Sequence, residues 1–334
     1  MDTLMSEVIK FGIIGCGMIA NVHADAISHI ENAKLLGVAD NFKEIAVKFA
    51  QSRGVKAYDS YAEMLKDENI DAVCICTPSL FHAPIAIEAL TAGKHVVLEK
   101  PMALDVDSAN EIIKACEKTG KKLTIIYQLR FEDDVNKVKK LVEDGAFGKI
   151  TLCNLFMKYY RSKEYYSSSS WKGTLKFDGG GALMNQGIHG VDVLEYIVGD
   201  IKNVSGKIKT LVHKIEVEDT AVATIEFENG ALGVIEASTC AYPGFDRMLE
   251  IYGESGYVIM RENVIEKLML NKQEIDVEKK RALGSASDPK AVTYGMHKKQ
   301  LVNFINAILG KEELVSDCYA GKKAVKVIKE IYKG

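Results

Sequence analysis

The segment Val8–Ala20, with the sequence VIKFGIIGCGMIA, decides the fold of this 334-residue chain. An apolar run leads into GCGMIA at residues 15–20, and an amphipathic helical pattern continues to Ile30. The first glycine permits a tight turn, the second lets the backbone approach a pyrophosphate, and the small sixth residue lets the helix pack on the strand. Because free N–H groups at a helix N-terminus attract phosphates, the segment predicts a dinucleotide-binding turn. Its predicted cofactor contacts are Gly15, Gly17, Met18, Ile19 and Ala20.

Asp40 ends the second apolar run, 20 residues beyond Ala20. A carboxylate at this position can accept hydrogen bonds from both ribose hydroxyls of NAD, whereas the 2′-phosphate of NADP would meet a like charge. Asn41 follows it, where an arginine would favour the phosphate. Asp40 and Asn41 are therefore predicted to bind the adenosine ribose of NAD, while Lys43 keeps NADP open as the alternative.

Short apolar strands alternate with amphipathic helices through the first third of the chain. The predicted strands are Val8–Ile14, Ala33–Ala39, Ala72–Cys76, His95–Glu99 and Lys122–Tyr127. The predicted helices are Ile19–Ile30, Lys43–Arg53, Tyr61–Lys66, His82–Ala92 and Val106–Thr119. This alternation predicts an α/β domain at residues 7–128, with a doubly wound parallel sheet of the Rossmann type.

After residue 128 the pattern changes to strands that follow one another without intervening helices. A helix at Asp133–Asp144, a strand at Ile150–Lys158 and a helix at Ala182–Val198 come first. The later strands are predicted at Val204–Val212, Thr220–Phe227, Ala231–Thr239, Met248–Gly253, Tyr257–Arg261 and Ile265–Leu270. Asn229-Gly230 predicts a hairpin, the segment 279–292 a loop, and His297–Leu309 and Tyr319–Tyr332 two final helices. Residues 129–334 are thus expected to form a second domain, of α+β type, with an antiparallel sheet.

Composition excludes several classes of protein. The 43 Lys and Arg residues against 46 Asp and Glu give a net charge of −3, so no nucleic-acid partner is expected. The seven cysteines form no C-x-x-C pair, and we predict reduced cysteines, a cytoplasmic location and no metal site. The sequence shows no apolar export signal and no apolar run of about 18 residues, so no membrane partner is expected.

Three further segments resemble signature segments of the glucose-fructose oxidoreductase and inositol dehydrogenase family, also called Gfo/Idh/MocA. They are Cys76-Thr77-Pro78 with His82, Glu99-Lys100-Pro101, and Gly179-Gly180-Gly181-Ala182-Leu183 leading to His189 and Asp192. The likeness runs from Lys10 to the final helix. It implies an NAD(P)-dependent dehydrogenase whose second domain, residues 129–334, has an open, mostly antiparallel sheet and serves substrate binding and oligomerisation. A homodimer or homotetramer is therefore expected. Further cofactor contacts implied by it are Thr77, Pro78, His82, Glu99, Lys100 and Gln128.

The resemblance also implies the catalytic residues. Lys100 would contact the substrate hydroxyl near the nicotinamide, where its charge favours a developing alkoxide. His189 would accept the hydroxyl proton, since the pKa of an imidazole lies near working pH. Where the inositol dehydrogenase pattern has an aspartate, four residues before the histidine, this chain has Asn185, which cannot take a proton. Asp192 either replaces that carboxylate or has a packing or hydrogen-bonding role.

Further polar and aromatic side chains are candidates for binding substrate. Arg130 follows the last predicted Rossmann strand, and a surface salt bridge is its alternative role. Aromatic rings stack on sugars, and arginine pairs with phosphate or carboxylate, although the loop that follows Tyr159 can equally pack against a neighbouring subunit. The remaining candidates are Tyr160, Arg161, Trp171 and, more weakly, His297. His23, His29, His95 and His213 carry no functional signal in the sequence.

The expected activity is NAD-dependent oxidation of a secondary hydroxyl of a sugar, cyclitol or sugar derivative. Three alternatives remain open at the level of sequence. A UDP-sugar 3-dehydrogenase would retain its NAD and recycle it with a 2-oxo acid. A redox glycosidase would use bound NAD to cleave a glycosidic bond, and a regulatory protein would sense the dinucleotide without turnover.

Overall fold

The computed structural model describes residues 7–278 and 293–334, which form two compact units. The first comprises residues 7–103, 107–128 and 293–322, and the second comprises residues 104–106, 129–278 and 323–334. The predicted loop at 279–292 lies outside the described residues. Within the described part of the chain, none of the helices is long and apolar enough to cross a membrane.

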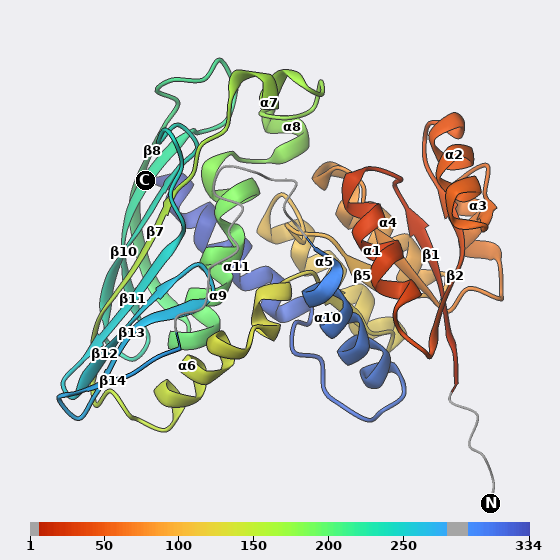
Figure 1. Cartoon of the computed structure of the whole chain (residues 1–334). Helices are drawn as coiled ribbons and strands as arrows, with labels where there is room; N and C mark the ends of the chain where they lie inside the picture. The colour runs from red at the N-terminus through yellow and green to blue at the C-terminus, as the bar shows by residue number, and fades with distance from the viewer. Residues whose placement is uncertain (1–6, 279–292) are drawn as a thin grey trace, which may run out of the picture. The chain divides into compact units, whose positions relative to one another are not determined.

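The first unit is built on a six-stranded parallel sheet (Figure 1). Its order is β3 (Lys56–Ala57), β2 (Ala33–Ala39), β1 (Ile9–Ile14), β4 (Ala72–Ile75), β5 (His95–Leu98) and β6 (Leu123–Ile125). The connecting helices are α1 (Met18–Ser28), α2 (Lys43–Arg53), α3 (Tyr61–Lys66), α4 (His82–Thr91) and α5 (Val106–Thr119). The order of strands reverses about β1, which confirms the predicted doubly wound sheet.

The helix α10 (Tyr294–Ile308) belongs to the first unit, although the sequence led us to expect residues 129–334 to form one domain. Leu301, Phe304 and Ile305 on this helix are fully buried in the same core as Phe11 of β1. The Phe11 and Phe304 ring centroids lie 6.4 Å apart. Burial of this apolar stripe against α1 and β1 accounts for its place in the first unit.

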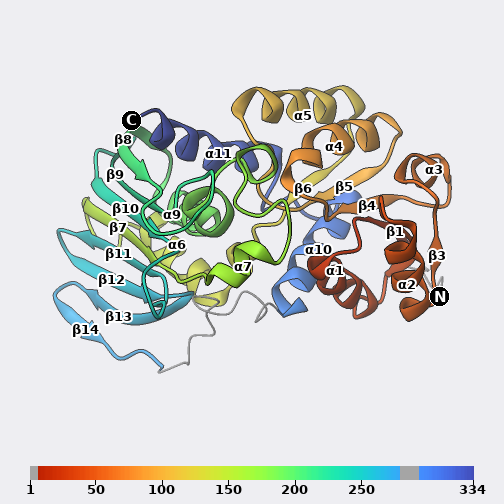
Figure 2. The same ribbon diagram turned by 90° about the horizontal axis from the view of Figure 1, so that it is seen from above.

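The second unit contains an eight-stranded sheet, which Figure 2 shows strand by strand. Only the β7–β10 pair is parallel, so the expectation of a mostly antiparallel sheet is confirmed. In sheet order the strands are β14 (Gln273–Ile275), β13 (Val264–Leu270), β12 (Gly256–Arg261), β11 (Met248–Gly253), β7 (Ile150–Lys158), β10 (Leu232–Ser238), β9 (Thr220–Phe227) and β8 (Ile201–Lys209).

The described helices of the second unit lie on one face of this sheet (Figure 2). They are α6 (Asp133–Glu143), α7 (Lys163–Ser167), α8 (Leu175–Asp178), α9 (Ile188–Val198) and the end of α11 (Cys318–Lys333). The segment Ala182–Gly187 before α9 is π-helical. On the covered face the alternating side chains of β7, such as Cys153, Leu155 and Met157, are fully buried. The opposite face carries Leu152, Val222 and Leu232, which are 40–58% exposed.

Candidate active site

The glycine turn of the first unit leaves room for a ligand. Gly15 has φ +91°, and a Cβ there would lie 2.8 Å from the backbone of Cys76, so glycine is required for the fold itself. A Cβ at Gly17 would meet no described atom within 4 Å. Gly17 caps α1 without a side-chain hydrogen bond among the described residues, and Met18 is exposed. The free N–H groups of α1 therefore face open space beside a backbone that can approach phosphate closely.

Asp40 lies next to this turn at the end of β2. Its Oδ2 accepts a hydrogen bond from the Cys16 N–H at 2.8 Å, and its Oδ1 accepts one from the Phe42 N–H, also at 2.8 Å. Carboxylate oxygens have further lone pairs for ribose hydroxyls. Lys43, the residue that kept NADP open, pairs with Asp59 at 2.5 Å. The charge nearest the expected ribose is thus negative, which fits NAD.

A chain of contacts joins the glycine turn to the turn that carries Lys100. The backbone at Cys76 and Thr77, just after β4, approaches Gly15 closely. His82 is buried and places Nε2 2.9 Å from the Thr77 carbonyl oxygen and Nδ1 2.6 Å from the Pro101 carbonyl oxygen. The ends of three neighbouring parallel strands, β1, β4 and β5, therefore meet at one edge of the sheet, where α/β folds bind ligands.

Two buried side-chain atoms at this edge lack a hydrogen-bond partner among the described residues. They are Thr77 Oγ1 and Gln128 Oε1, and both residues are partly exposed overall. Buried polar atoms are nearly always satisfied, so a bound polar group is expected at each of these two atoms. An amide such as that of nicotinamide would supply both a donor and an acceptor. Together with the open glycine turn, these atoms fit the cofactor that the sequence predicts.

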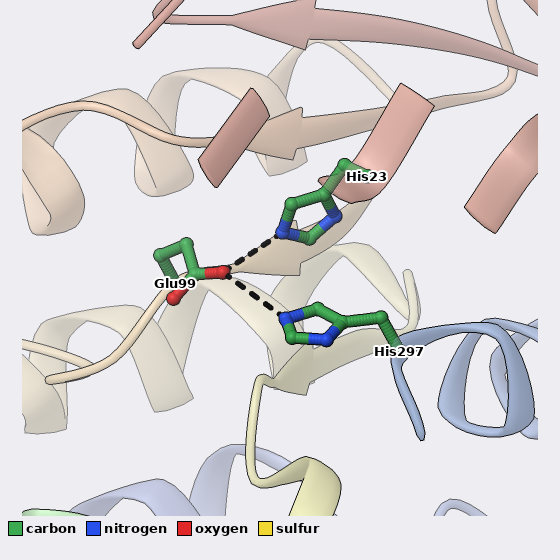
Figure 3. Close-up of side chains that lie close together, drawn as sticks. All are labelled: His23, Glu99 and His297. Atoms are coloured by element: carbon green, nitrogen blue, oxygen red, sulfur yellow. Dashed lines mark hydrogen bonds and ion pairs between the residues drawn. The ribbon is translucent and has the colours of Figure 1, made fainter. Parts of the chain in front are cut away.

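Glu99 directly precedes the partly exposed Lys100 and is itself buried in the interior of the first unit, where Figure 3 shows it with His23 and His297. Glu99 Oε1 lies 2.8 Å from His23 Nε2 and 3.8 Å from His297 Nε2. Burial opposes ionisation of Glu99, but the imidazoles of His23 and His297 hold its pKa well below the ordinary range. His297, a substrate contact predicted from the sequence, thus lies in the interior of the first unit. Only 1% of its surface is exposed, so it is buried rather than accessible to a substrate.

In the second unit, the triple glycine has a structural reason. A Cβ at Gly181 would lie 1.9 Å from the Glu218 carbonyl oxygen, and one at Gly180 would lie 2.1 Å from the Tyr332 hydroxyl. The Glu218 carboxylate accepts hydrogen bonds from the Gly181 and Leu183 N–H groups at 2.7 and 2.9 Å. The glycines therefore let the chain approach Glu218, which caps the helical segment that leads to His189. The sequence analysis did not single out Glu218.

Asn185, Gln186 and His189 are the partly exposed residues of the otherwise buried stretch 181–190. The π-helical segment and the start of α9 present them on an accessible surface. An accessible imidazole on a rigid, buried helix is suited to contact a substrate and exchange a proton with it.

Asp192, by contrast, is held by Arg130. The Arg130 Nη2 and Asp192 Oδ1 atoms lie 2.7 Å apart, and Arg130 Nε donates to both carboxylate oxygens at 3.1 and 3.2 Å. Both residues are buried, and burial raises the pKa of Asp192 although Arg130 opposes the rise. Of the roles left open for Asp192, this geometry favours the hydrogen-bonding one, and Arg130 joins it in the interior.

The aromatic loop holds a buried arginine. Arg161 lies over the rings of Tyr159 and Tyr165 at 5.8 and 5.6 Å, and its Nη1 donates to the Tyr160 carbonyl oxygen at 2.8 Å. Lys172 lies 4.4 Å from the centre of the Tyr165 ring and 5.9 Å from that of the Trp171 ring. Tyr160 and Trp171 remain partly exposed. The loop thus brings aromatic faces and two cations together, a combination suited to a sugar or an anion.

Comparison with known proteins connects both units of the chain to one family. A model described as an oxidoreductase family with an NAD-binding Rossmann fold matches residues 9–127, and the GFO/IDH/MocA C-terminal domain matches residues 135–259. The uncharacterized oxidoreductase YrbE of Bacillus subtilis is 33% identical over 260 residues, 75% of this chain and 73% of that protein. This chain belongs to the GFO/IDH/MocA family. The resemblance found in the sequence is confirmed, and the protein is an NAD-binding oxidoreductase.

Two relatives of this GFO/IDH/MocA protein have named activities or ligands. The myo-inositol 2-dehydrogenase of Thermotoga maritima is 30% identical over 266 residues, covering 77% of this chain and 76% of that protein. The WlbA dehydrogenase from Bordetella pertussis, solved in complex with NADH and UDP-GlcNAcA, is 32% identical with a TM-score of 0.87. That match covers 98% of this chain and 96% of the other. Relatives of this chain therefore include a cyclitol dehydrogenase and a dehydrogenase that binds a nucleotide sugar.

The departure at Asn185 from the family's aspartate has a structural counterpart. Asn185 Nδ2 donates to Asp178 Oδ1 at 3.1 Å, and Asp178 Oδ2 accepts from the Gly173 N–H at 2.6 Å. A carboxylate is thus present beside Asn185, contributed by the end of α8, seven residues earlier in the chain. Sequence analysis missed Asp178 because α8 has only four residues and no detectable periodicity. It also missed His23, which lies on α1 and contacts Glu99 only in the folded unit.

Proposed function

We propose that this protein oxidises a secondary hydroxyl group of a sugar, cyclitol or sugar derivative with NAD. When bound, NAD supplies the hydride acceptor. The observation that supports the proposal most is the position of the turn that carries Lys100. His82 contacts the carbonyl oxygens of Pro101 in that turn and of Thr77, whose backbone lies close to Gly15 of the glycine turn. A cation is thereby placed at the edge of the sheet where the cofactor is expected. The two relatives with cyclitol and nucleotide-sugar names support the choice of substrate class.

Each side chain at the site has a separate role in the proposed reaction. The Lys100 ammonium donates to the substrate hydroxyl and stabilises negative charge on its oxygen. His189 accepts the hydroxyl proton, and Asn185, held by Asp178, donates to the substrate as an amide. Asp40 and Asn41 hold the adenosine ribose, while Thr77 and Gln128 bind the nicotinamide amide. Tyr160, Arg161 and Trp171 bind the rest of the substrate.

A substrate panel tests the reaction. The purified protein is incubated with NAD and free sugars, inositols, glycosides or UDP-sugars, each with and without 2-oxoglutarate, and products are identified by mass spectrometry. We expect one class to lose about two mass units, the signature of oxidation to a carbonyl. If NAD binds but no compound is converted, the dehydrogenase proposal is wrong and a dinucleotide sensor is indicated. Glycoside cleavage without net NADH indicates the redox glycosidase instead.

The role of Lys100 is tested by Lys100→Ala. The variant should lose about 10²–10³-fold in kcat, because the cation that stabilises the alkoxide is gone. Its affinity for NAD, measured by calorimetry, should stay within about threefold of the parent. Lys118→Ala, an exposed lysine on α5, is the matched control and should retain activity. Turnover that survives in Lys100→Ala would refute the assigned mechanism.

A nucleotide-sugar substrate is the second candidate. It is favoured by the cluster of Arg161, Lys172, Tyr165 and Trp171, and by the similarity to a dehydrogenase solved with UDP-GlcNAcA. Arginine and lysine suit phosphate or carboxylate, and aromatic faces suit the base or the sugar. Product formed only from UDP-sugars, or only in the presence of the 2-oxo acid, would select this candidate over a free polyol.

We also propose a cytoplasmic homodimer or homotetramer. All seven cysteines are free, as expected for a reducing compartment. The exposed side chains Leu152, Val222 and Leu232 lie on neighbouring strands of the open face of the second sheet. These exposed apolar side chains are suited to pack against the same face of a second copy.

A further inference from the structure

The interior of the first unit holds a hydrogen-bonded pair that the proposed reaction leaves unused. His23 on α1 and Glu99 after β5 lie 76 positions apart in sequence, yet His23 Nε2 and Glu99 Oε1 are 2.8 Å apart. Their side chains are 0% and 8% exposed. Figure 3 shows both imidazoles, His23 and His297, directed at the same carboxylate oxygen. An ionised carboxylate is costly to bury unless it is hydrogen-bonded, so the contact with His23 favours the charged form of Glu99 there.

The two oxygens of Glu99 have different partners. Oε1 faces His23, while Oε2 accepts a hydrogen bond from the backbone N–H of Lys100 at 3.3 Å. A continuous path therefore runs from the His23 ring through the Glu99 carboxylate to the main chain of Lys100. On the other side of Lys100, His82 contacts the Pro101 carbonyl oxygen. The backbone on both sides of Lys100 is thus held by buried polar side chains.

The distances favour a shared proton over a shared metal ion. Two ligands bound tetrahedrally to one zinc ion at about 2.0–2.1 Å stand roughly 3.3 Å apart. The 2.8 Å separation of His23 Nε2 and Glu99 Oε1 is shorter and matches a charge-assisted hydrogen bond. His297 Nε2, at 3.8 Å from the same oxygen, is too far for a direct hydrogen bond. Its ring instead meets that of His23 edge-on, with centroids 5.4 Å apart.

We propose that His23 is a positioning residue for Lys100: it donates to Glu99 and fixes the carboxylate, which in turn holds the backbone amide of Lys100. The inference rests on the proposed function because it takes Lys100 as the group that touches substrate. His23 itself touches neither substrate nor cofactor in this scheme. Its loss should therefore affect kcat more than the binding of NAD.

The pH dependence follows from the groups around Glu99. The groups around Glu99 are His23 from α1, His82 from α4, the adjacent Lys100 and His297 from α10. Its partner His23 also lies near Cys74 of β4 and Cys76, which follows that strand. With His23 present, the pKa of Glu99 is held well below its ordinary range. Without that donor, His297 is the imidazole that still opposes the effect of burial, so the pKa of Glu99 rises relative to the parent. Glu99 then takes up a proton as the pH falls, so the acid limb of turnover should move to higher pH.

Three variants test the proposal. His23→Leu fills the space with an apolar side chain and removes the N–H that donates to Glu99. His23→Gln keeps an N–H that can reach Glu99. His29→Leu, at the exposed residue that caps the C-terminal end of the same helix, is the matched control. Activity is measured from pH 5 to 9 on the substrate identified by the panel. If the protein retains its NAD and completes only one turnover, the rate at which the bound NAD is reduced is followed by stopped-flow absorbance instead. NAD affinity is measured by calorimetry and the melting temperature by fluorescence.

We expect His23→Leu to lose between about 10- and 100-fold in kcat, as for a misplaced catalytic group, with NAD affinity within about threefold of the parent. The acid limb of its pH–activity profile should move to higher pH by about one unit or more. His23→Gln should recover most of kcat and return the limb toward that of the parent, and His29→Leu should behave as the parent. A purely structural role predicts a lower melting temperature without the change in the pH profile.

Each contrary outcome is decisive. Unchanged kcat and pH profile in His23→Leu would overturn the positioning role, even where Lys100→Ala is inactive and the proposed function stands. If Lys100→Ala keeps full turnover, the mechanism assigned to Lys100 fails, and the positioning role falls with it, while loss of NAD-dependent conversion of every compound in the panel is what would overturn the proposed function. Elemental analysis could also find stoichiometric zinc in the purified parent protein and none in His23→Leu. That result would overturn the proposal, because a zinc ion rather than a proton would then join His23 and Glu99.

Discussion

Gly15 and Gly17 belong to one motif, but a side chain would meet different surroundings at each. At Gly15 the positive φ and the approach to Cys76 leave no space for a Cβ. At Gly17 the protein itself places no described atom within 4 Å of a Cβ, and φ is −76°. The motif therefore combines one glycine that the fold needs with one whose openness is explained by a ligand.

These surroundings give a prediction for the pair of variants Gly15→Ala and Gly17→Ala. Gly15→Ala should destabilise the protein by about 1–2 kcal/mol or more, since an L-residue is strained at positive φ and its Cβ crowds Cys76. Gly17→Ala should leave the melting temperature nearly unchanged but weaken NAD binding roughly tenfold, about 1.4 kcal/mol. Thermal melts and calorimetric titration measure both effects. Equal NAD affinity in Gly17→Ala and the parent would show that phosphate does not approach this backbone.

At the scale of elements, the sequence predicted best where local pattern and packing agree. The helices at Lys43–Arg53 and Val106–Thr119 and the strands at Ala33–Ala39 and Ile150–Lys158 have the predicted bounds. The strand expected at Val204–Val212 is instead β8, Ile201–Lys209. The backbone N–H groups of residues 211–213 donate to the Asp219 carboxylate, which turns the chain away from the sheet. A distant side chain thus ends this strand, and local hydropathy carries no sign of it.

The helical pattern at Ala182–Val198 illustrates the same limit. Its apolar period predicted one helix, whereas residues 182–187 are π-helical and α9 begins at Ile188. The hydrogen bonds from the Gly181 and Leu183 N–H groups to Glu218 hold the start of this segment. The short elements β3, α7, α8 and β14 were also missed, since pieces of two to five residues depend on tertiary contacts and show no period.

Helix α9 carries a group that links stability to pH. Burial, followed by the proximity of Asp192, raises the pKa of Glu195 from 4.5 to about 8. Between these values the folded protein keeps a proton that the unfolded chain has released, so stability falls as pH rises from about 4.5 to 8. Glu195→Gln mimics the protonated form. Its melting temperature should exceed that of the parent by several degrees at pH 8.5 and differ little at pH 5.

The control for this prediction is Glu228→Gln, at an exposed position outside α9. It should give the same melting temperature as the parent at both pH values. A shift in Glu195→Gln of equal size at pH 5 and pH 8.5 would mean that the change acts through packing rather than through ionisation.

At the scale of the whole molecule, the open face of the second sheet bears on assembly. Leu152 of β7 lies opposite Leu232 of β10, and Val222 lies on the adjacent β9. All three side chains are at least 40% exposed in the single chain. Burial of such a face between two copies would gain roughly 25 cal/mol for each Å² of apolar surface removed from water.

We therefore expect light scattering after size exclusion to give twice or four times the 36.8 kDa chain mass. The double variant Val222→Lys/Leu232→Lys should shift the population toward the single chain, because like charges would face each other across the interface. Leu211→Lys, which alters an exposed leucine beyond the end of β8, is the control and should keep the parent mass. A parent protein that elutes as a monomer at micromolar concentration would rule the assembly out.

The sequence by itself determined the two types of sheet, the glycine turn with Asp40, the place of Lys100 just after a parallel strand and that of His189 on a helix. These features follow from periodicity and from motifs a few residues long, which local physics can specify. Only the tertiary structure decided that α10 joins the first unit, that Asp192 pairs with Arg130, and that Asp178 stands beside Asn185. It also decided the partners of Glu99, since His23 and His297 come from helices far from it in sequence. A carboxylate is paired by whichever group the fold brings to it in the interior, and no local pattern records that choice.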